Sequence, residues 1–381
     1  MRKKNLLPQD VKFLFWVRFT KILSLVPFNI IDYLADILGF FIYYFAHRHR
    51  KRIFSNISVC SKITLNEKDL KKITRKNIQL FIGCVLELPK IFHKKNLSTR
   101  VLCDNPEIRT LLCKKNQPFI VFCLHQANWE LFFLEATALM PGAAVAKPSK
   151  KSVLYRYMTA LRTRFGGKII SSNTAFKDGT NFLSSGVSIG IVGDQGKARK
   201  NFNTDFLGEE DSFSTLPALL SYKTNAPIFV ATMKKIEGKY RINYSDPIYP
   251  NLNSPFDEDV KRMTLTSLKL FEEAIIANPE SWLWIYNRYK KDYAAVILES
   301  KKNLDLDSIL SRYPNYRLFF FFLDDLDLNH LPKDYRFSVL INYTSNKKIE
   351  AHFKNLSVYK LIDPLKEPID SKSFIVAKNS T

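Results

Sequence analysis

The sequence predicts an α/β fold: an αβα sandwich around a mixed sheet, with an N-terminal membrane-associated helix and a small C-terminal α/β extension. Through the centre of the chain, short apolar runs alternate with segments of helical periodicity, as expected for a sheet covered by helices. A long apolar stretch at residues 22–46 precedes them. Residues 297–381 follow them and contain further strand-like apolar runs.

The expected elements begin with a helix and continue with alternating strands and helices. Residues 65–92 predict a helix, because apolar residues recur at helical spacing while basic residues gather on the other side. Strands are expected at residues 119–124, 143–146, 168–170, 188–192, 228–233 and 241–244, and helices at 129–140, 153–165, 174–184, 214–224 and 255–278. In the extension, residues 317–323 and 337–342 predict two more strands.

The composition indicates a folded protein with anionic partners. Of the 381 residues 46% are hydrophobic, and only 12 are glycine and 17 proline, which argues against disorder. Lysine and arginine number 58 against 36 acidic residues, and the charge of +22 indicates nucleic acid, acidic lipid or an acidic protein as partner. The 30 phenylalanines favour lipid among these. The five cysteines form no C-x-x-C pair, and their odd number fits a reducing compartment.

The apolar stretch at residues 22–46 is long enough to cross a membrane as a helix, but it contains two acidic residues. Asp32 and Asp36 share one helical face near its middle, where each opposes insertion by ~2.5–3.5 kcal/mol. Basic residues flank the stretch on both sides, which fits a segment that lies in an anionic leaflet. We therefore favour a segment that lies in the membrane interface over one that spans the membrane, and both alternatives stay open. A signal peptide is excluded, because no small-residue cleavage site follows.

The strongest chemical signal is an apolar strand followed by a histidine and a glutamate. Residues 119–124 lead into His125, and Glu130 comes five positions later, at the start of an expected helix. An imidazole can remove the proton of an attacking hydroxyl, typically worth ~10²–10⁴ in rate, and a carboxylate on its second nitrogen fixes the tautomer. The sequence thus predicts His125 as a general base oriented by Glu130. The alternative is a histidine that ends a strand beside a surface glutamate.

Cations and a polar pair come later in the chain. Residues 147–168 contain seven basic residues and no acidic one. They are Lys147, Lys150, Lys151, Arg156, Arg162, Arg164 and Lys168. A planar guanidinium suits a phosphate or a developing oxyanion, so Arg162 and Arg164 are expected at the substrate, whereas a solvated face is the alternative for the lysines. Asp194 and Gln195 end an apolar strand, where ligands of such sheets collect, and simple capping of the strand is the alternative.

One hydrolase motif is present in the wrong context. Residues 186–190 read G-x-S-x-G around Ser188, but a nucleophile elbow has a strand before it and a helix after it, and here the expected order is reversed. The sequence contains no G-x-G-x-x-G, Walker A or H-E-x-x-H motif. Serine-hydrolase, nucleotide and zinc-dependent chemistry therefore lack support, and we expect no cofactor and no metal.

Six motifs occur in the same order as in a known family. They are the basic run at 48–56, residues 125–131, Arg162-Thr-Arg164, Gly193-Asp194-Gln195, Phe206-Leu-Gly208 and residues 282–290. Through them the chain resembles the bacterial lipid A late acyltransferases from about residue 26 to residue 291. The resemblance implies a glycerolipid-acyltransferase-like core, an acyl carrier protein donor and a phosphorylated, Kdo-bearing lipid A precursor as acceptor. It also implies that Asn128, Lys147, Arg162, Arg164, Asp194 and Gln195 border the substrate beside His125. By the same resemblance, Asp194 and Gln195 are expected to orient an arginine or the acceptor sugar.

The predicted organisation is a membrane-anchoring region at residues 1–60, an acyltransferase domain at 61–296 and an extension of unknown role at 297–381. The predicted function is transfer of a fatty acyl chain from acyl carrier protein to a hydroxyl of the precursor. It would occur at the cytoplasmic face of the inner membrane, with membrane lipid as a further partner and no nucleic acid. Two alternatives stay open. One is acylation of another glycolipid or lysophospholipid, such as a mannosylated phosphoinositide, and the other is a non-catalytic basic membrane-binding protein.

Overall fold

The computed structural model describes residues 8–58, 60–94, 96–114, 117–147, 153–195, 202–286, 288, 292–298, 316–322, 337–341, 360–362 and 373–377. The chain divides into two compact units. Residues 1–45, 72–206 and 210–283 form the first unit, and residues 46–71, 207–209 and 284–381 form the second.

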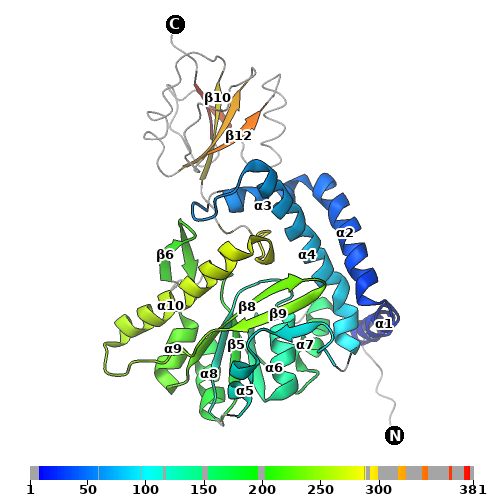
Figure 1. Cartoon of the computed structure of the whole chain (residues 1–381), viewed down its shortest axis with the longest axis vertical. Helices are drawn as coiled ribbons and strands as arrows, with labels where there is room; N and C mark the ends of the chain where they lie inside the picture. The colour runs from blue at the N-terminus through cyan, green and yellow to red at the C-terminus, as the bar shows by residue number, and fades with distance from the viewer. Residues whose placement is uncertain are drawn as a thin grey trace. The chain divides into compact units, whose positions relative to one another are not determined.

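A seven-stranded sheet forms the centre of the first unit (Figure 1). Its strands are, in spatial order, β1 (Val101–Cys103), β9 (Lys239–Tyr244), β8 (Ile228–Ile236), β2 (Ile120–Cys123), β5 (Ser188–Val192), β3 (Gly142–Ala146) and β4 (Lys168–Ser171). The β8–β9 pair is antiparallel and the other pairs are parallel, so the sheet is mixed, as predicted.

Helices cover both faces of this sheet, which confirms the predicted sandwich (Figure 1). On one side lie α6 (Glu130–Leu139) and α7 (Val153–Thr163), and on the other α8 (Ala175–Ser184), α9 (Leu216–Thr224) and α10 (Phe256–Ala277). Side chains of a strand alternate between the two faces. Phe119 and Cys123 therefore join the core that includes α6, whereas Phe122 meets Phe271 of α10 edge on, at 5.0 Å between ring centroids.

The apolar stretch near the N-terminus is divided into two helices. The first, α1 (Pro8–Leu23), ends within the stretch, and Pro27 precedes the second, α2 (Phe28–Phe45). In the described part of the chain, α2 is the one helix that is long and apolar enough to cross a membrane by length and composition. The predicted helix at residues 65–92 is confirmed as α4 (Glu67–His93).

Several elements were not predicted. Among them are β1, α5 (Pro106–Lys114) and a two-stranded sheet of β6 (Phe202–Phe206) and β7 (Glu209–Phe213). β1 has only three residues, which is too short for a periodic pattern. β6 and β7 each contain acidic residues, so they lack the apolar run that marks a strand.

The second unit contains α3 (His47–Ser58) and a parallel sheet. In α3, Asn56 Nδ2 donates to the carbonyl oxygens of Trp284 and Tyr286, each at 2.7 Å. The sheet has the order β12 (Phe337–Ile341), β11 (Tyr316–Phe322), β10 (Asp292–Leu298), β14 (Ser373–Ala377) and β13 (Lys360–Ile362). The two strands predicted in the extension are confirmed as β11 and β12, and all the pairs in this sheet are parallel.

Candidate active site

His125 and Asp194 meet because the strands that precede them are neighbours. β2 and β5 pair in parallel through their last residues, so the segments after both strands leave the sheet at the same edge. The two segments stay close, because Gly193 N donates to Cys123 O at 3.1 Å. A Cβ atom at Gly193 would lie 2.5 Å from the ring of Phe122, so this close approach requires glycine.

Asp194 holds the imidazole of His125. Asp194 Oδ1 accepts a hydrogen bond from His125 Nδ1, and Oδ2 accepts from His125 N at 3.1 Å and from Trp282 Nε1 at 2.8 Å. The side chain of Asp194 is 1% exposed and that of His125 is 18% exposed, so a buried carboxylate supports a ring that reaches solvent. A carboxylate on Nδ1 selects the tautomer in which the lone pair of Nε2 can accept a proton. Chemically, this pair can act as a general base and its orienting acid.

Glu130 has a different partner from the predicted one. Its carboxylate accepts hydrogen bonds from Arg162 Nε at 2.8 Å and Arg162 Nη2 at 2.5 Å, and Oε1 also accepts from Trp129 Nε1 at 3.1 Å. The prediction that Glu130 orients His125 is therefore corrected in favour of Asp194. Glu130 opens α6 and Arg162 lies in the last turn of the neighbouring α7, where a two-point pairing of guanidinium and carboxylate is strongly favoured.

Arg162 is a charged group held in a fixed orientation. Burial by itself would lower its pKa, but the hydrogen bonds and the charge of Glu130 raise the pKa above the usual value for arginine. The arginine side chain is 24% exposed, against 7% for Glu130. Its bonds to Glu130 use Nε and Nη2, and Nη1 has no hydrogen-bond partner among the described residues. The Nη1 donors can therefore bind an anionic group of a substrate.

The turn that carries His125 is fixed from several sides. Ala127 has a φ of 44°, which is uncommon for a residue with a side chain, and Ala127 N donates to Ser281 O at 2.6 Å. Asn128 is 2% exposed, and its Nδ2 donates to Glu87 Oε2 at 3.1 Å. Asn128, predicted to border the substrate, thus holds the turn to α4. A turn held by several contacts keeps the imidazole in place before substrate binds.

The remaining predicted residues do not gather at His125 through any described contact. Arg164 Nη2 donates to Lys94 O, and its guanidinium lies 4.2 Å from the centre of the Phe165 ring. Lys147 is exposed at the end of β3, and Gln195 is exposed directly after Asp194. Lys150 and Lys151 lie outside the described residues.

Two residues of the site were missed by sequence reasoning. Glu87 is fully buried in α4, and the signal for it was an acidic residue within the apolar run Val85-Leu-Glu-Leu88. Trp282 belongs to a motif that was recognised, but nothing in the sequence indicated that its indole would bind Asp194. The G-x-S-x-G motif is structural: Ser188 is the first residue of β5, and its Oγ accepts from Phe119 N at 3.3 Å.

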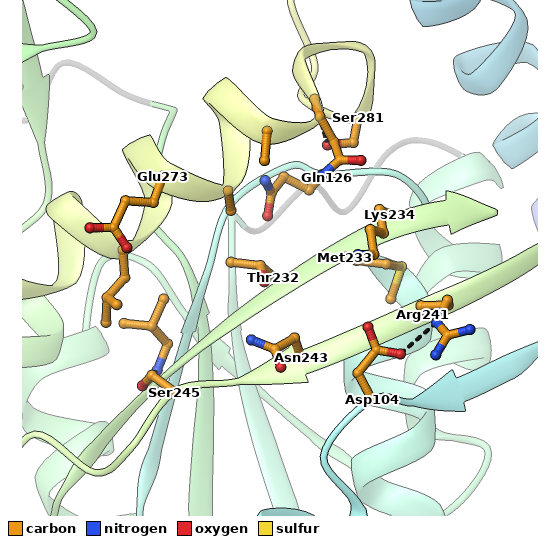
Figure 2. Close-up of a pocket in the computed structure, with 15 residues that line it drawn as sticks. Asp104, Gln126, Thr232, Met233, Lys234, Arg241, Asn243, Ser245, Glu273 and Ser281 are labelled. Carbon is orange, nitrogen blue, oxygen red and sulfur yellow. Dashed lines mark hydrogen bonds and ion pairs between the residues drawn. The ribbon is translucent and has the colours of Figure 1, made fainter.

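A polar pocket of about 330 Å³ lies behind the turn that carries His125, between α10 and the strands β8 and β9 (Figure 2). Gln126 reaches it from the turn, Thr232 and Asn243 from the strands and Glu273 from α10. Gln126 is 1% exposed, and its Oε1 has no hydrogen-bond partner within the described part of the chain. Because Lys234 and Glu273 bring charges of both signs, the lining suits a polar group and not an acyl chain.

The buried thiols near the site are not nucleophiles. Burial raises the pKa of Cys84 to about 12 and raises that of Cys123 as well, so both remain protonated at neutral pH. Among the residues that the structure describes, no cluster of three or more histidine, cysteine, aspartate or glutamate side chains could hold a metal ion. The side chains of the site support proton transfer and anion binding.

The profile of one protein family matches this chain. It is described as bacterial lipid A biosynthesis acyltransferase, and it matches residues 1–291, a range that contains both His125 and Asp194 as well as the Glu130–Arg162 pair. A search of curated proteins found no match.

Proposed function

Because the chain belongs to the bacterial lipid A biosynthesis acyltransferase family, we propose that it transfers a fatty acyl chain from an acyl carrier protein thioester to a hydroxyl of a phosphorylated, Kdo-bearing lipid A precursor. The observation that carries this proposal is the buried Asp194 on Nδ1 of His125. It leaves Nε2 as the proton acceptor on the exposed side of the ring, and acylation of a hydroxyl benefits from such a base.

In the proposed reaction, His125 Nε2 takes the proton of the acceptor hydroxyl as its oxygen attacks the thioester carbonyl carbon. The carbonyl oxygen becomes an oxyanion in the tetrahedral intermediate. Collapse of the intermediate completes the ester and breaks the C–S bond, and the imidazolium returns its proton to the departing sulfur. Asp194 stabilises the imidazolium without taking the proton. Atoms and electrons balance between the two substrates, so the proposal includes no cofactor and no metal.

Arg162 is proposed to stabilise negative charge near the reacting centre. Its Nη1 donors can bind either the developing oxyanion or a phosphate of the acceptor, and a guanidinium held in advance needs no reorganisation during the reaction. Glu130 acts through Arg162, because it fixes the plane of the guanidinium. The proposed role of Glu130 is thus to orient Arg162 and not His125.

The proposed partners are consistent with the charge and the exposed surface. The charge of +22 favours binding of both acyl carrier protein, as an acidic protein, and a phosphorylated lipid. The family is generally membrane-associated, and α1 and α2 expose large apolar side chains. We propose that the enzyme works at the cytoplasmic face of the inner membrane, where both substrates can reach it.

The test is mass spectrometry of the precursor after incubation with acyl carrier protein thioester and the purified full chain. The wild type is compared with His125→Ala and with His49→Ala, which removes an exposed imidazole as a matched control. Wild type and His49→Ala should add the mass of one acyl chain, and His125→Ala should add it ~10²–10⁴-fold more slowly.

Two results would contradict the proposal. Equal acylation by His125→Ala would remove the base assignment. No mass change from folded, vesicle-bound wild type, together with acylation of another glycolipid, would change the acceptor.

A further inference from the structure

One face of α2 packs on α4 at backbone contact. Its buried residues are Ile31, Ala35 and Gly39, which recur every four positions. A Cβ atom at Gly39 would lie 2.8 Å from the Cα atom of Gln79 in α4, and Gln79 Nε2 donates to the backbone oxygen of Asp36 at 3.1 Å. The contacts therefore extend from residue 31 to residue 39 of the helix and are not confined to one end.

Asp32 in α2 is bound by cations of the globular body. Arg100 Nη1 and Nη2 donate to its two oxygens at 2.8 Å and 2.6 Å, and Lys235 Nζ donates to Oδ1 at 2.6 Å. The side chain of Arg100 is 4% exposed, and it also binds the fully buried Glu87. Burial by itself would lower the pKa of Arg100, but Asp32 and Glu87 raise the pKa above its usual value. Arg100 therefore forms an ion pair with each of the two carboxylates.

Glu87 connects Arg100 to the turn that carries His125. Glu87 Oε1 accepts from Arg100 Nη2, and Glu87 Oε2 accepts from Asn128 Nδ2 at 3.1 Å. If α2 left the body, Arg100 would lose one of its carboxylates, and a buried charge would remain poorly compensated beside the turn. The structure thus favours a helix that stays on the body while the enzyme is active.

Crossing a bilayer would require α2 to break these contacts. Its 18 residues extend over roughly 27 Å, which is slightly less than the thickness of the hydrocarbon core. The whole helix would therefore have to lie inside the core. Asp32 and Asp36 would then lie in hydrocarbon, where charged side chains oppose insertion. Asp32 would have to lose Arg100 and Lys235 to reach that position.

The opposite faces of α1 and α2 expose an apolar surface bordered by cations. Large side chains at least 38% exposed are Leu14, Phe15, Trp16, Phe19, Ile22 and Leu23 on α1, and Ile30, Tyr33, Leu34, Leu38, Phe40, Phe41, Tyr44 and Phe45 on α2. On α1, Lys12, Arg18 and Lys21 are exposed beside them. Both helices lie at the same edge of the first unit (Figure 1). Aromatic and aliphatic groups with adjacent cations suit the boundary between anionic headgroups and acyl chains.

We propose that α1 and α2 form one docking surface for a single anionic lipid leaflet, in which α2 lies parallel to the membrane plane and does not cross it. This deepens the proposed function, on which the choice of an anionic leaflet rests. A monotopic arrangement keeps the Asp32–Arg100–Glu87–Asn128 chain of contacts intact while the enzyme is bound to the membrane.

The test measures the depth of the middle of α2 in vesicles of anionic phospholipid. The full chain carries Leu38→Trp, at a position 42% exposed, together with Trp16→Phe. Bromine atoms are placed on the lipid chains either near the carbonyl end or near the methyl end. Trp282 and Trp284 are at most 2% exposed, and the Trp16→Phe chain gives their background and that of Trp129.

Quenching by bromine near the carbonyl end should exceed quenching near the methyl end by at least about twofold, and affinity should be at least about tenfold weaker for uncharged vesicles. Stronger quenching near the methyl end, equal affinity for both vesicles or no binding would each overturn the proposal.

A pair of variants tests whether Asp32 fixes the helix. Asp32→Asn should lower the thermal unfolding midpoint and move the tryptophan at position 38 deeper into the bilayer. Asp36, one helical turn later, is exposed, and Asp36→Asn should change neither the midpoint nor the depth. Equal effects of the two variants would overturn the role of Asp32.

These measurements need no turnover. A chain that docks at shallow depth but acylates nothing would count against the proposed function alone, and an active chain with a deep α2 would count against this inference alone.

Discussion

Asp194→Asn tests which acid orients His125: Asp194, as in the structure, or Glu130, as predicted from the sequence. Asp194 Oδ2 accepts hydrogen bonds from two donors, His125 N and Trp282 Nε1. In the variant, the single amide oxygen is needed at that position, because the amide nitrogen cannot accept from either donor. The amide nitrogen must then face His125 Nδ1. Nδ1 becomes an acceptor, the proton moves to Nε2, and the nitrogen that should take the hydroxyl proton is already protonated.

The expected loss is the full contribution of general-base catalysis. That contribution is ~10²–10⁴ in kcat, which corresponds to about 2.7–5.4 kcal/mol of transition-state stabilisation. Folding should change much less, because the amide keeps the shape and the two bonds at Oδ2. A change of about 1–2 kcal/mol in the free energy of unfolding is expected for the exchanged bond at Nδ1.

The assay is the initial rate of acyl transfer at saturating thioester, with thermal unfolding as the control for folding. In a His125→Ala background, Asp194→Asn should have no further effect, because it acts only through the imidazole. Glu130→Gln should lower the residual rate in the same background, because it acts through Arg162. A kcat of folded Asp194→Asn within about tenfold of wild type would refute the reasoning.

Three further outcomes are expected. Arg162→Lys should lower kcat/KM by ~10² because an ammonium cannot bind its carboxylate partner at two points and still present a further donor, whereas Arg164→Lys should stay within about threefold in the same assay. Gly193→Ala should destabilise the fold by about 1–3 kcal/mol in denaturant unfolding, since the methyl group would meet the buried ring of Phe122; an unchanged midpoint would show that the ring can move. Cys84, with its pKa raised to about 12, should resist alkylation at pH 8 in the folded protein, and labelling located there by peptide mass would contradict its burial.

The elements of the core could be predicted because their patterns are local. β2 is an uninterrupted apolar run, β5 is apolar after its first residue, and α10 has a long helical period, so their positions agree with the predicted ranges to within a few residues. β1 and the β6–β7 pair could not be predicted, because short or polar strands depend on their neighbours in the sheet. The break between α1 and α2 was visible only as a proline within an apolar stretch, which does not show whether a helix kinks or ends.

The sequence by itself determined the fold class, the family and the identity of the chemical groups, since motifs and periodicity are properties of the chain order. His125, Glu130, Arg162 and Asp194 were all singled out from it. Only the tertiary structure decided which carboxylate serves which cation. The parallel pairing of β2 with β5 brings Asp194 to His125 from 69 positions away, while α7 brings Arg162 to Glu130. Spacing along the chain favoured the nearer acid, but distance in a sheet is set by strand order, which the spacing of two residues does not encode.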